Sequence, residues 1–338
     1  MAENVIRRAG RDDIPRIMAF IKTYWSATHI LANDRAFFEY EHTCGEEVCF
    51  VLSEDPGKLE VQAILGFIPY GIQKRDAMIV MWKARPGENA FLGVQVLQFL
   101  VGSIGARVVG SCGINKRVAG IYQYLGYHTG SLAHYYRIAD LNEYKIAFVG
   151  EKNILPVKPA DGYELAPFGS FAELETSFDF EITGDAKPYK EPWYIKKRYF
   201  NHPVYRYKAF GIRNQAGMVE TLLFAREIEA NGARVLRMVD LIGGVEPLAH
   251  ISAGIQKLLD NNGYEYVDFY QYGIPHEVMQ AAGFTLREGN TNIIPNYFEP
   301  FVRENIGIDY FTTDNEGFRI FKGDGDQDRP SLTARSQE

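Results

Sequence analysis

Apolar and polar residues alternate along the chain in blocks that predict strands and amphipathic helices in turn. The clearest block runs from Ala106 to Tyr127. A short apolar strand, 107–112, is followed by a polar turn and then by a helix that ends at Gly126, a residue type that tolerates the left-handed turn after a helix. Apolar side chains of this helix recur at i, i+3, i+4 and i+7, namely at Val118, Ile121, Tyr122 and Leu125.

The rest of the first half is predicted to follow the same alternation. Asp13 and Pro15 mark a helix start, because Asp caps free N–H groups and Pro is tolerated in the first turn. The predicted strands are 4–9, 48–52, 61–70, 77–83 and one ending at 134–137, and the predicted helices are 14–21, a charged aromatic stretch at 25–42, and 93–104.

The second half repeats this order of elements at a nearly constant offset. The closing glycines Gly126 and Gly283 lie 157 positions apart (283 minus 126), and the first strands lie 158 apart (163 minus 5). A constant offset is typical of a duplicated domain, although two unrelated α/β domains could share the order by chance. We predict domains at 1–150 and 151–322, with a linker around 153–162 and a polar, mobile tail at 323–338.

The helix of the 106–127 block carries a recognisable motif. Asn115, Val118, Tyr122, Gly126 and Tyr127 fit the pattern N-x-x-[AV]-x-x-x-Y-x-x-x-G-[FY]. This pattern resembles the last motif of the GCN5-related N-acetyltransferase (GNAT) superfamily. A buried strand–helix unit of another α/β protein is the alternative interpretation.

The resemblance implies an α/β fold of two tandem GNAT-like domains, each a twisted mixed sheet flanked by helices. Three segments also resemble acyltransferase-like proteins of bacterial O-antigen and capsule sugar biosynthesis: HILANDRAFFEYEH at 29–42, WKARPGENAFLG at 82–93 and GDGDQDRP at 323–330.

In this superfamily a glycine-containing turn before a helix holds the pyrophosphate of coenzyme A with its backbone N–H groups. The resemblance places that turn at 85–93 and implies Gly87, Asn89, Gly93 and Asn115 as residues that bind acetyl-CoA or another acyl-CoA. Glu88 and Phe91 depart from the family pattern. The loop at 241–246 of the second half is also rich in glycine and also departs from it, so the sequence does not say which half binds the co-substrate.

The resemblance implies that Tyr122 donates a proton to the departing thiolate, since an ordinary tyrosine is protonated at neutral pH. A core tyrosine with its hydroxyl hydrogen-bonded is the alternative. Met279, at the equivalent position of the second half, cannot donate a proton.

Two residues are candidates for the general base. Asp240 lies inside an apolar strand, where a carboxylate is costly unless it is paired or functional; Arg237 or Arg226 would be its structural partner. His29 lies on the charged aromatic stretch, which in GNAT folds borders the acceptor site, together with Asp34 and Glu41. The 158 offset matches Asp240 with Trp82, which could stack on a sugar or base. A solvated helix face with hydrogen-bonded histidines is the alternative for 29–42.

Composition narrows the functional classes. The net charge of −7 disfavours a broad nucleic-acid surface, and the chain has no apolar run long enough for a membrane span. The start of the chain lacks the apolar core of a signal peptide, and three cysteines without a C-x-x-C pair indicate neither a disulfide framework nor a zinc site, so we expect a cytoplasmic protein. Asp324, Asp326 and Asp328 resemble the start of a calcium loop, but Arg329 stands where that loop needs glycine, and we expect no metal.

The leading hypothesis is therefore an N-acyltransferase that moves an acetyl group from acetyl-CoA to the amine of a small acceptor. The polysaccharide resemblance implies a nucleotide-linked amino sugar as that acceptor. A non-catalytic sugar- or nucleotide-binding protein and a Fem-type aminoacyl transferase, for which the 196–198 Lys-Lys-Arg run could contact RNA, are the alternatives. A homodimer is left open.

Overall fold

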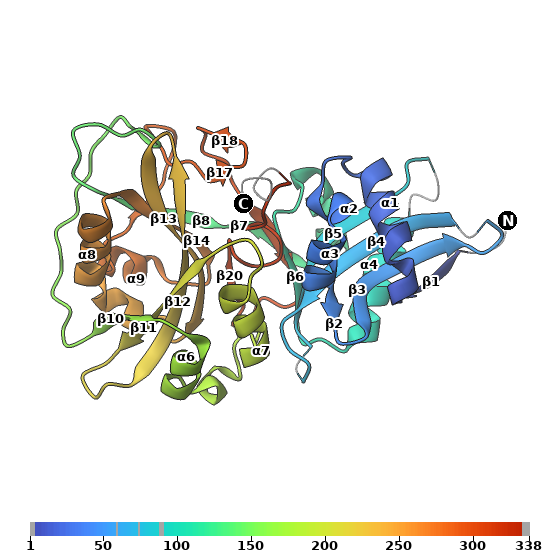
Figure 1. The fold of residues 1–338 in the computed structure, drawn as a ribbon, viewed down its shortest axis with the longest axis horizontal. Helices are drawn as coiled ribbons and strands as arrows, with labels where there is room; N and C mark the ends of the chain where they lie inside the picture. Colours follow the sequence, from blue (N-terminus) through green and yellow to red (C-terminus); the bar gives the residue numbers. More distant parts are fainter. Residues whose placement is uncertain (1–3, 59, 74, 88–90, 333–338) are drawn as a thin grey trace.

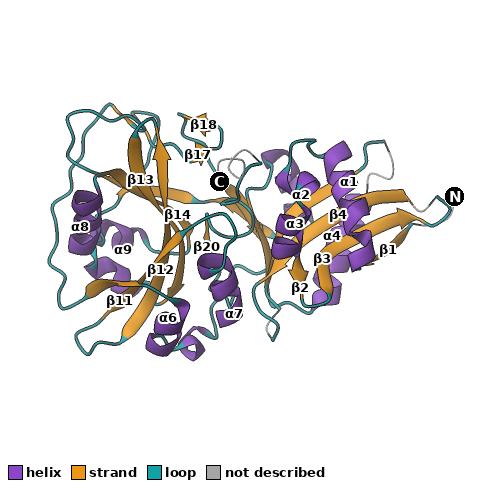
Figure 2. Ribbon diagram, in the orientation of Figure 1, coloured by secondary structure: helices purple, strands orange, loops and turns teal. Residues whose placement is uncertain are grey.

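The computed structural model describes residues 4–58, 60–73, 75–87 and 91–332, and Figure 1 shows them as two lobes with the end of the chain between them. Within these residues the strands build two eight-stranded mixed sheets and two small two-stranded antiparallel sheets. Helices cover the sheets (Figure 2). The predicted fold class, twisted mixed sheets flanked by helices, is confirmed.

The first sheet has the order β1-β3-β4-β5-β6-β19-β7, with β2 beside β3. The bounds are β1 Val5–Ala9, β2 Thr43–Cys44, β3 Glu47–Asp55, β4 Glu60–Pro69, β5 Ala77–Ala84, β6 Val109–Cys112, β7 His128–Ser131 and β19 Asp309–Thr312.

The second sheet has the corresponding order β10-β11-β12-β13-β14-β8-β15, with β20 beside β14. The bounds are β8 Ala133–Ile138, β10 Glu164–Phe168, β11 Tyr207–Arg213, β12 Val219–Ala230, β13 Ala233–Gly243, β14 Tyr264–Tyr272, β15 Thr285–Leu286 and β20 Ile320–Phe321. The small pairs are β9 Phe148–Val149 with β16 Asn292–Ile293, and β17 Tyr297–Phe298 with β18 Phe301–Val302.

The helices of the described residues are α1 Ile14–Tyr24, α2 Ile30–Asn33, α3 Arg35–His42, α4 Leu92–Ile104, α5 Ala119–Tyr124, α6 Phe171–Ser177, α7 Pro192–Ile195, α8 Ser252–Asn262 and α9 His276–Ala281. In the first half, α1, α4 and α5 lie close to predicted helices, and the predicted stretch 25–42 divides into α2 and α3. Short helical turns occur at Arg11–Asp13, Lys116–Val118, Phe180–Thr183, Lys196–Phe200 and Glu246–His250. None of the helices in the described part of the chain has the length and apolar character that crossing a membrane requires.

The two sheets exchange one strand each. β8, from the first half of the chain, pairs with β14 and β15 of the second sheet. β19, from near the end of the chain, inserts between β6 and β7 of the first sheet. We call the first sheet with its helices the first lobe and the second sheet with its helices the second lobe; neither is a continuous piece of sequence.

One hydrophobic core spans both lobes. It contains Ile68, Tyr70 and Met78 of the first lobe with Phe168, Leu222 and Val239 of the second. Full burial of such a side chain contributes about 1.5–3 kcal/mol. Separating the lobes would therefore expose a large apolar surface to water.

Asp324, in the predicted polar tail, contacts Tyr70 of the first lobe and Lys190 of the second, and residues 333–338 lie outside the described part of the chain. Asp324 and Asp328 are 0% and 2% exposed. Asp324 forms an ion pair with Lys190 (2.8 Å), and Asp328 forms one with Arg226 (2.7 Å). The polar tail is buried because its carboxylates neutralise cations inside the protein.

Candidate functional site

Each sheet contains a wedge where two parallel strands separate. In the first sheet, β5 and β6 pair only at Ala77–Val109 and Met78–Gly110. In the second sheet, the register of β13 with β14 ends at Met238–Phe269. Beyond these points, no further pairing of either strand pair occurs among the described residues, so the two strands of each pair separate there.

A β-bulge lies beside each wedge. On β5, the register with β4 skips Val80, and on β13 the register with β12 skips Val239. A bulge leaves one residue out of the ladder and redirects nearby backbone groups. The two lobes thus carry the same local distortion at the same place.

The bulges correct the alignment of the two halves. They lie 159 positions apart (239 minus 80), and this offset matches Asp240 with Met81, not with Trp82 as the sequence offset of 158 indicated. The position of a bulge follows from the hydrogen bonds between neighbouring strands, and an offset measured between glycines of the sequence does not reveal it.

The wedge of the second lobe is filled by the chain itself. β20 pairs with β14, Lys322 N donates to Tyr270 O (3.3 Å), and Gly323 N donates to Val239 O at the bulge (2.8 Å). Both walls of this wedge therefore already hold hydrogen-bond partners from residues 320–323.

Asp240 lies directly after this second bulge and is 0% exposed. Its carboxylate accepts hydrogen bonds from Lys190 Nζ (2.5 Å) and Tyr199 Oη (2.6 Å). Burial raises the pKa of Asp240 to about 6. Lys190 has two carboxylate neighbours, Asp240 and Asp324, and their negative charges outweigh burial and raise the pKa of the lysine. This closed network favours a structural ion pair.

The partner of Asp240 differs from the expected one. Arg237 pairs with Asp268 (2.7 Å) and Arg226 pairs with Asp328 (2.7 Å). Lys190 comes from the loop before α7, fifty positions from Asp240, and no local sequence pattern linked the two residues.

The first lobe brings three predicted residues together at its wedge. Trp82 Nε1, on β5, donates to the carbonyl oxygen of Gly93 in the first turn of α4 (2.9 Å). The Trp82 ring lies 5.5 Å from the ring of Tyr122 on α5, and Tyr122 stacks on Phe311 at 4.0 Å. Trp82 and Tyr122 thus form an aromatic pair between the strand before the wedge and the helix after it.

Tyr122 is 3% exposed. Burial raises the pKa of its hydroxyl above the ordinary value, so the hydroxyl is protonated at neutral pH. Among the described residues, no hydrogen-bond partner of the Tyr122 hydroxyl is found. A protonated hydroxyl of this kind can act as a proton donor.

The start of α4 fits a phosphate group better than the corresponding position in the second lobe. α4 has thirteen residues and no acidic side chain in its first turn, and the first N–H groups of a helix have no partner within the helix. Gly87 adopts the left-handed conformation (φ 82°) that the predicted turn requires. Asn89, like Glu88, lies outside the described residues.

The corresponding loop of the second lobe does not fit a pyrophosphate. Gly244 N already donates to Glu220 O (3.1 Å). Glu246 follows in the first turn of the next helical segment, where its negative charge would repel phosphate. This loop closes against β12 instead of presenting its N–H groups.

Three other predicted residues are helix caps. The side chain of Asn115 accepts from Arg117 N (3.0 Å), His29 Nδ1 accepts from Leu31 N (3.2 Å), and Asp34 accepts from Phe37 N (2.9 Å). Burial lowers the pKa of His29 to about 3. α2 and α3 pack on the face of the first sheet opposite to α4 and α5, so His29 and Asp34 do not join the aromatic pair.

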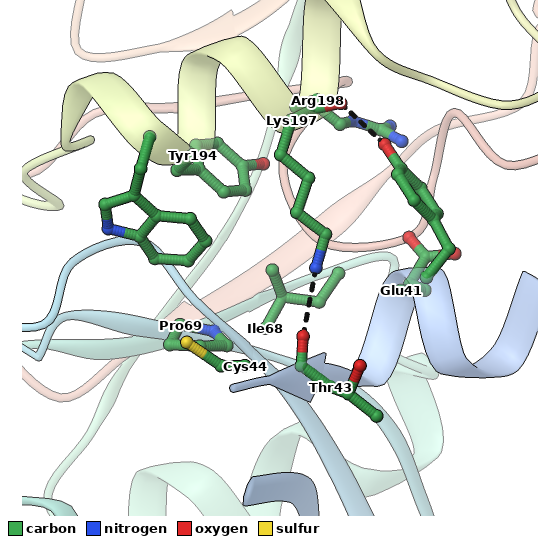
Figure 3. A pocket seen from close by; sticks show the side chains of 10 residues that line it. Glu41, Thr43, Cys44, Ile68, Pro69, Tyr194, Lys197 and Arg198 are labelled. Carbon is green, nitrogen blue, oxygen red and sulfur yellow. Dashed lines mark hydrogen bonds between the residues drawn. The ribbon is translucent and has the colours of Figure 1, made fainter. Parts of the chain in front are cut away.

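Glu41 also lies away from the aromatic pair, and it is not on a solvated face. It is 6% exposed and lines a narrow recess between the lobes, together with Lys197 and Arg198 (Figure 3). The sequence analysis considered Glu41 and the 196–198 run separately. Their meeting depends on how the lobes pack, which no local pattern indicates.

Comparison with known proteins identifies the fold. No model of a protein family matches the chain, and no curated protein matches its sequence. Among solved structures, it is similar to a GCN5-related N-acetyltransferase from Anabaena variabilis, with a TM-score of 0.58 and 12% identity. It is also similar to a conserved protein of unknown function from Enterococcus faecalis, named as a probable N-acyltransferase, with a TM-score of 0.55 and 10% identity.

Each of these two alignments covers 92% of this chain and 72% of the other chain. The similarity therefore extends over both lobes. The chain has the fold of the GCN5-related N-acetyltransferases.

Proposed function

We propose that the protein is an acyl-CoA-dependent N-acyltransferase whose acyl-CoA site is the wedge of the first lobe. The observation that carries this proposal is the difference between the two wedges. β20 pairs with β14 in the second wedge, whereas no described strand pairs with β5 and β6 in that way in the first. The first wedge also has the aromatic pair and a helix N-terminus without an acidic first turn.

In this proposal the acyl-CoA supplies the acyl thioester. The first-turn N–H groups of α4 would hold its pyrophosphate, with Gly87 forming the turn and Trp82 fixing the helix start through Gly93. The uncharged acceptor amine forms the new C–N bond as the C–S bond breaks. Tyr122 donates its proton to the departing thiolate, and the proton lost by the amine restores the Tyr122 hydroxyl through solvent.

The finer assignment is an acetyl group and a nucleotide-linked amino sugar used in surface polysaccharide synthesis. The segments 29–42 and 82–93 support it through their resemblance to proteins of that pathway. The roles of His29 and Asp240 as bases, and of Trp82, Asp34 and Glu41 in acceptor binding, stay predictions.

A non-catalytic GNAT-fold protein is the second candidate. The filled wedge and closed loop of the second lobe favour it for that lobe. A Fem-type transferase is less favoured, because Arg198 of the 196–198 run is buried between the lobes and is not available to RNA.

Calorimetry with acetyl-CoA and turnover of a panel of amino sugars test the proposal. We expect one site per chain in the wild type. Tyr122→Phe should bind acetyl-CoA with unchanged affinity and lose turnover, while Tyr124→Phe, on the same helix but 90% exposed, should keep both. The non-catalytic alternative is supported if millimolar acetyl-CoA gives neither heat nor a thermal shift. Two equivalent sites would contradict the assignment to the first lobe.

A further inference from the structure

Residues 321–325 pass from the second lobe to the wedge of the first, and Figure 1 shows this end of the chain between the two lobes. Cys112, two positions beyond the last pairing of β6 with β5, donates from its Sγ to Phe321 O (3.6 Å). A Cβ at Gly325 would lie 3.5 Å from Cγ1 of Val80, the bulge residue of β5. The segment therefore follows the opening between β5 and β6.

The first wedge has two faces with different surroundings. On one face, α4 and α5 pack with Ile79 of β5, and the phosphate position at the start of α4 belongs to this face. On the other face, Met78, Val80 and Cys112 pack into the core that the two lobes share. An acyl chain that enters from α4 and passes between the strands presents its thioester toward this second face. The acceptor amine must then meet the thioester on the side of residues 321–325.

Lys322 lies in this segment and carries a buried amine without a partner. The residue is 2% exposed. Its Nζ lies 5.8 Å from the ring centroid of Tyr270 and 4.9 Å from that of Tyr297. Among the described residues, no hydrogen bond or ion pair of this Nζ is found. Since a fully buried lysine is normally paired, the amine of Lys322 is free to interact with a substrate.

The charged groups around Lys322 do not neutralise it. Those that act on it are Arg237, Cys112, Asp268 and Asp328. Asp268 pairs with Arg237 (2.7 Å), and Asp328 pairs with Arg226 (2.7 Å), so both carboxylates already hold a cation. Burial, assisted by the positive charge of Arg237, lowers the pKa of Lys322 to about 7. A lysine of this kind is partly uncharged at neutral pH and can accept a proton.

We propose that Lys322 is the general base of the acyl transfer, and that its amine accepts the proton that the ammonium group of the acceptor loses before attack. This inference rests on the function proposed above. The proton moves from the acceptor nitrogen to Nζ of Lys322, the freed electron pair forms the C–N bond, and Tyr122 protonates the departing thiolate. Lys322 then releases its proton to solvent beside Tyr297, which is 36% exposed. The acid and the base thus act from opposite faces of the wedge.

The pH dependence of kcat, measured at saturating acetyl-CoA and amino sugar, tests this role. We expect kcat of the wild type to fall as the pH drops below about 7, because Lys322 then gains a proton and no longer acts as a base. Lys322→Met should lower kcat about 100-fold or more and remove this pH dependence. Its affinity for acetyl-CoA, measured by calorimetry, should stay unchanged, which also shows that the variant is folded.

Two further variants separate proton transfer from a structural effect. Lys322→Arg keeps a cation but does not give up its proton near neutral pH, so it should be as impaired as Lys322→Met. Lys187→Met is the control, since Lys187 is a partly buried lysine that already pairs with Asp314 (2.7 Å). Thr313 N, next to Asp314, donates to Val109 O at the start of β6, away from the wedge. Lys187→Met should keep kcat and its pH dependence.

The outcomes distinguish this inference from the proposed function. Full activity of Lys322→Arg, or an unchanged pH dependence in Lys322→Met, would overturn the role of Lys322 and leave the acyl transfer standing. A wild type that binds no acetyl-CoA, or that acetylates no amine, would overturn both.

Discussion

Gly323 N–H and the carbonyl oxygen of Val239 form a 2.8 Å hydrogen bond at the bulge of the second lobe. Val239 is the counterpart of Val80, which stands beside the wedge proposed to hold the acyl thioester. Residues near the C-terminal end of the chain thus occupy, in the second lobe, the backbone position that corresponds to the proposed acyl-CoA site of the first lobe.

A side chain at Gly323 should destabilise the protein. A Cβ there would lie 2.6 Å from Val239 O, so Gly323→Ala must move the inserted segment or break its hydrogen bond, at a cost of about 1–3 kcal/mol. Urea unfolding measures the effect. Gly307→Ala, where a Cβ meets nothing within 4 Å, is the control, and equal stability of the two variants would contradict the close packing.

Replacing one member of the buried ion pair between Lys190 and Asp240 should lower the stability of the protein. Lys190→Met leaves the carboxylates of Asp240 and Asp324 buried without the cation that they share, and we expect a loss of about 3–5 kcal/mol in the free energy of unfolding. Asp240→Asn should cost less, because Lys190 keeps its ion pair with Asp324. In the double variant only the Asp324 carboxylate lacks its cation, so this variant should be less destabilised than the sum of the single variants. Additive effects in the double-mutant cycle would show that the two residues do not interact.

Stability should fall as the pH drops below about 6.5. Burial lowers the pKa of His29, His42 and His202 to about 3 in the folded protein. The unfolded chain, with ordinary histidines, therefore binds more protons between about pH 6.5 and pH 3, and each histidine removes at most about 1.4 kcal/mol per pH unit there.

His29→Asn isolates one of these contributions. Asparagine can replace the Nδ1 cap of α2 and does not titrate, so the fall in melting temperature between pH 6.5 and pH 4 should become shallower. A slope equal to that of the wild type would contradict the buried, neutral state of His29.

A negative charge at the start of α4 should weaken acyl-CoA binding. Gln95 and Gln98 are both exposed on α4, but only Gln95 is near its first turn. Gln95→Glu should lower the affinity by about 0.3–1 kcal/mol at low salt and leave the helix as stable or more stable, because acidic groups favour a helix N-terminus but repel phosphate. Gln98→Glu is the control, and an equal loss in both variants would place the phosphates elsewhere.

Local pattern was enough to predict most elements and part of the site. The spacing around Tyr122 and Gly126 predicted the strand and the helix that carry the aromatic pair. Trp82 contacts both Gly93 and Tyr122, and all three residues lie on elements that the local pattern predicted in the correct order.

Long-range pairing explains what local pattern missed. The alternation in 133–138 predicts a strand but does not say which sheet it joins, and the pairing of β8 with β14 spans the two halves. Asp324 and Asp328 were expected in a polar tail because the residues that form ion pairs with them, Lys190 and Arg226, are distant in sequence. A solvated face was left open as the alternative for Glu41 for the same reason, since Lys197 and Arg198, which line the same recess, come from the other lobe.

The strand exchange has a consequence for synthesis on the ribosome. β19 lies between β6 and β7, yet Asp309 follows Ser131, the last residue of β7, by 178 positions. At about 5–20 residues per second, the edges of β6 and β7 stay unpaired for roughly 10–35 s after β7 has been made. During this time the nascent first lobe presents open strand edges to other chains, so its assembly must wait for nearly the whole polypeptide, and chaperones that shield such edges should raise its folding yield.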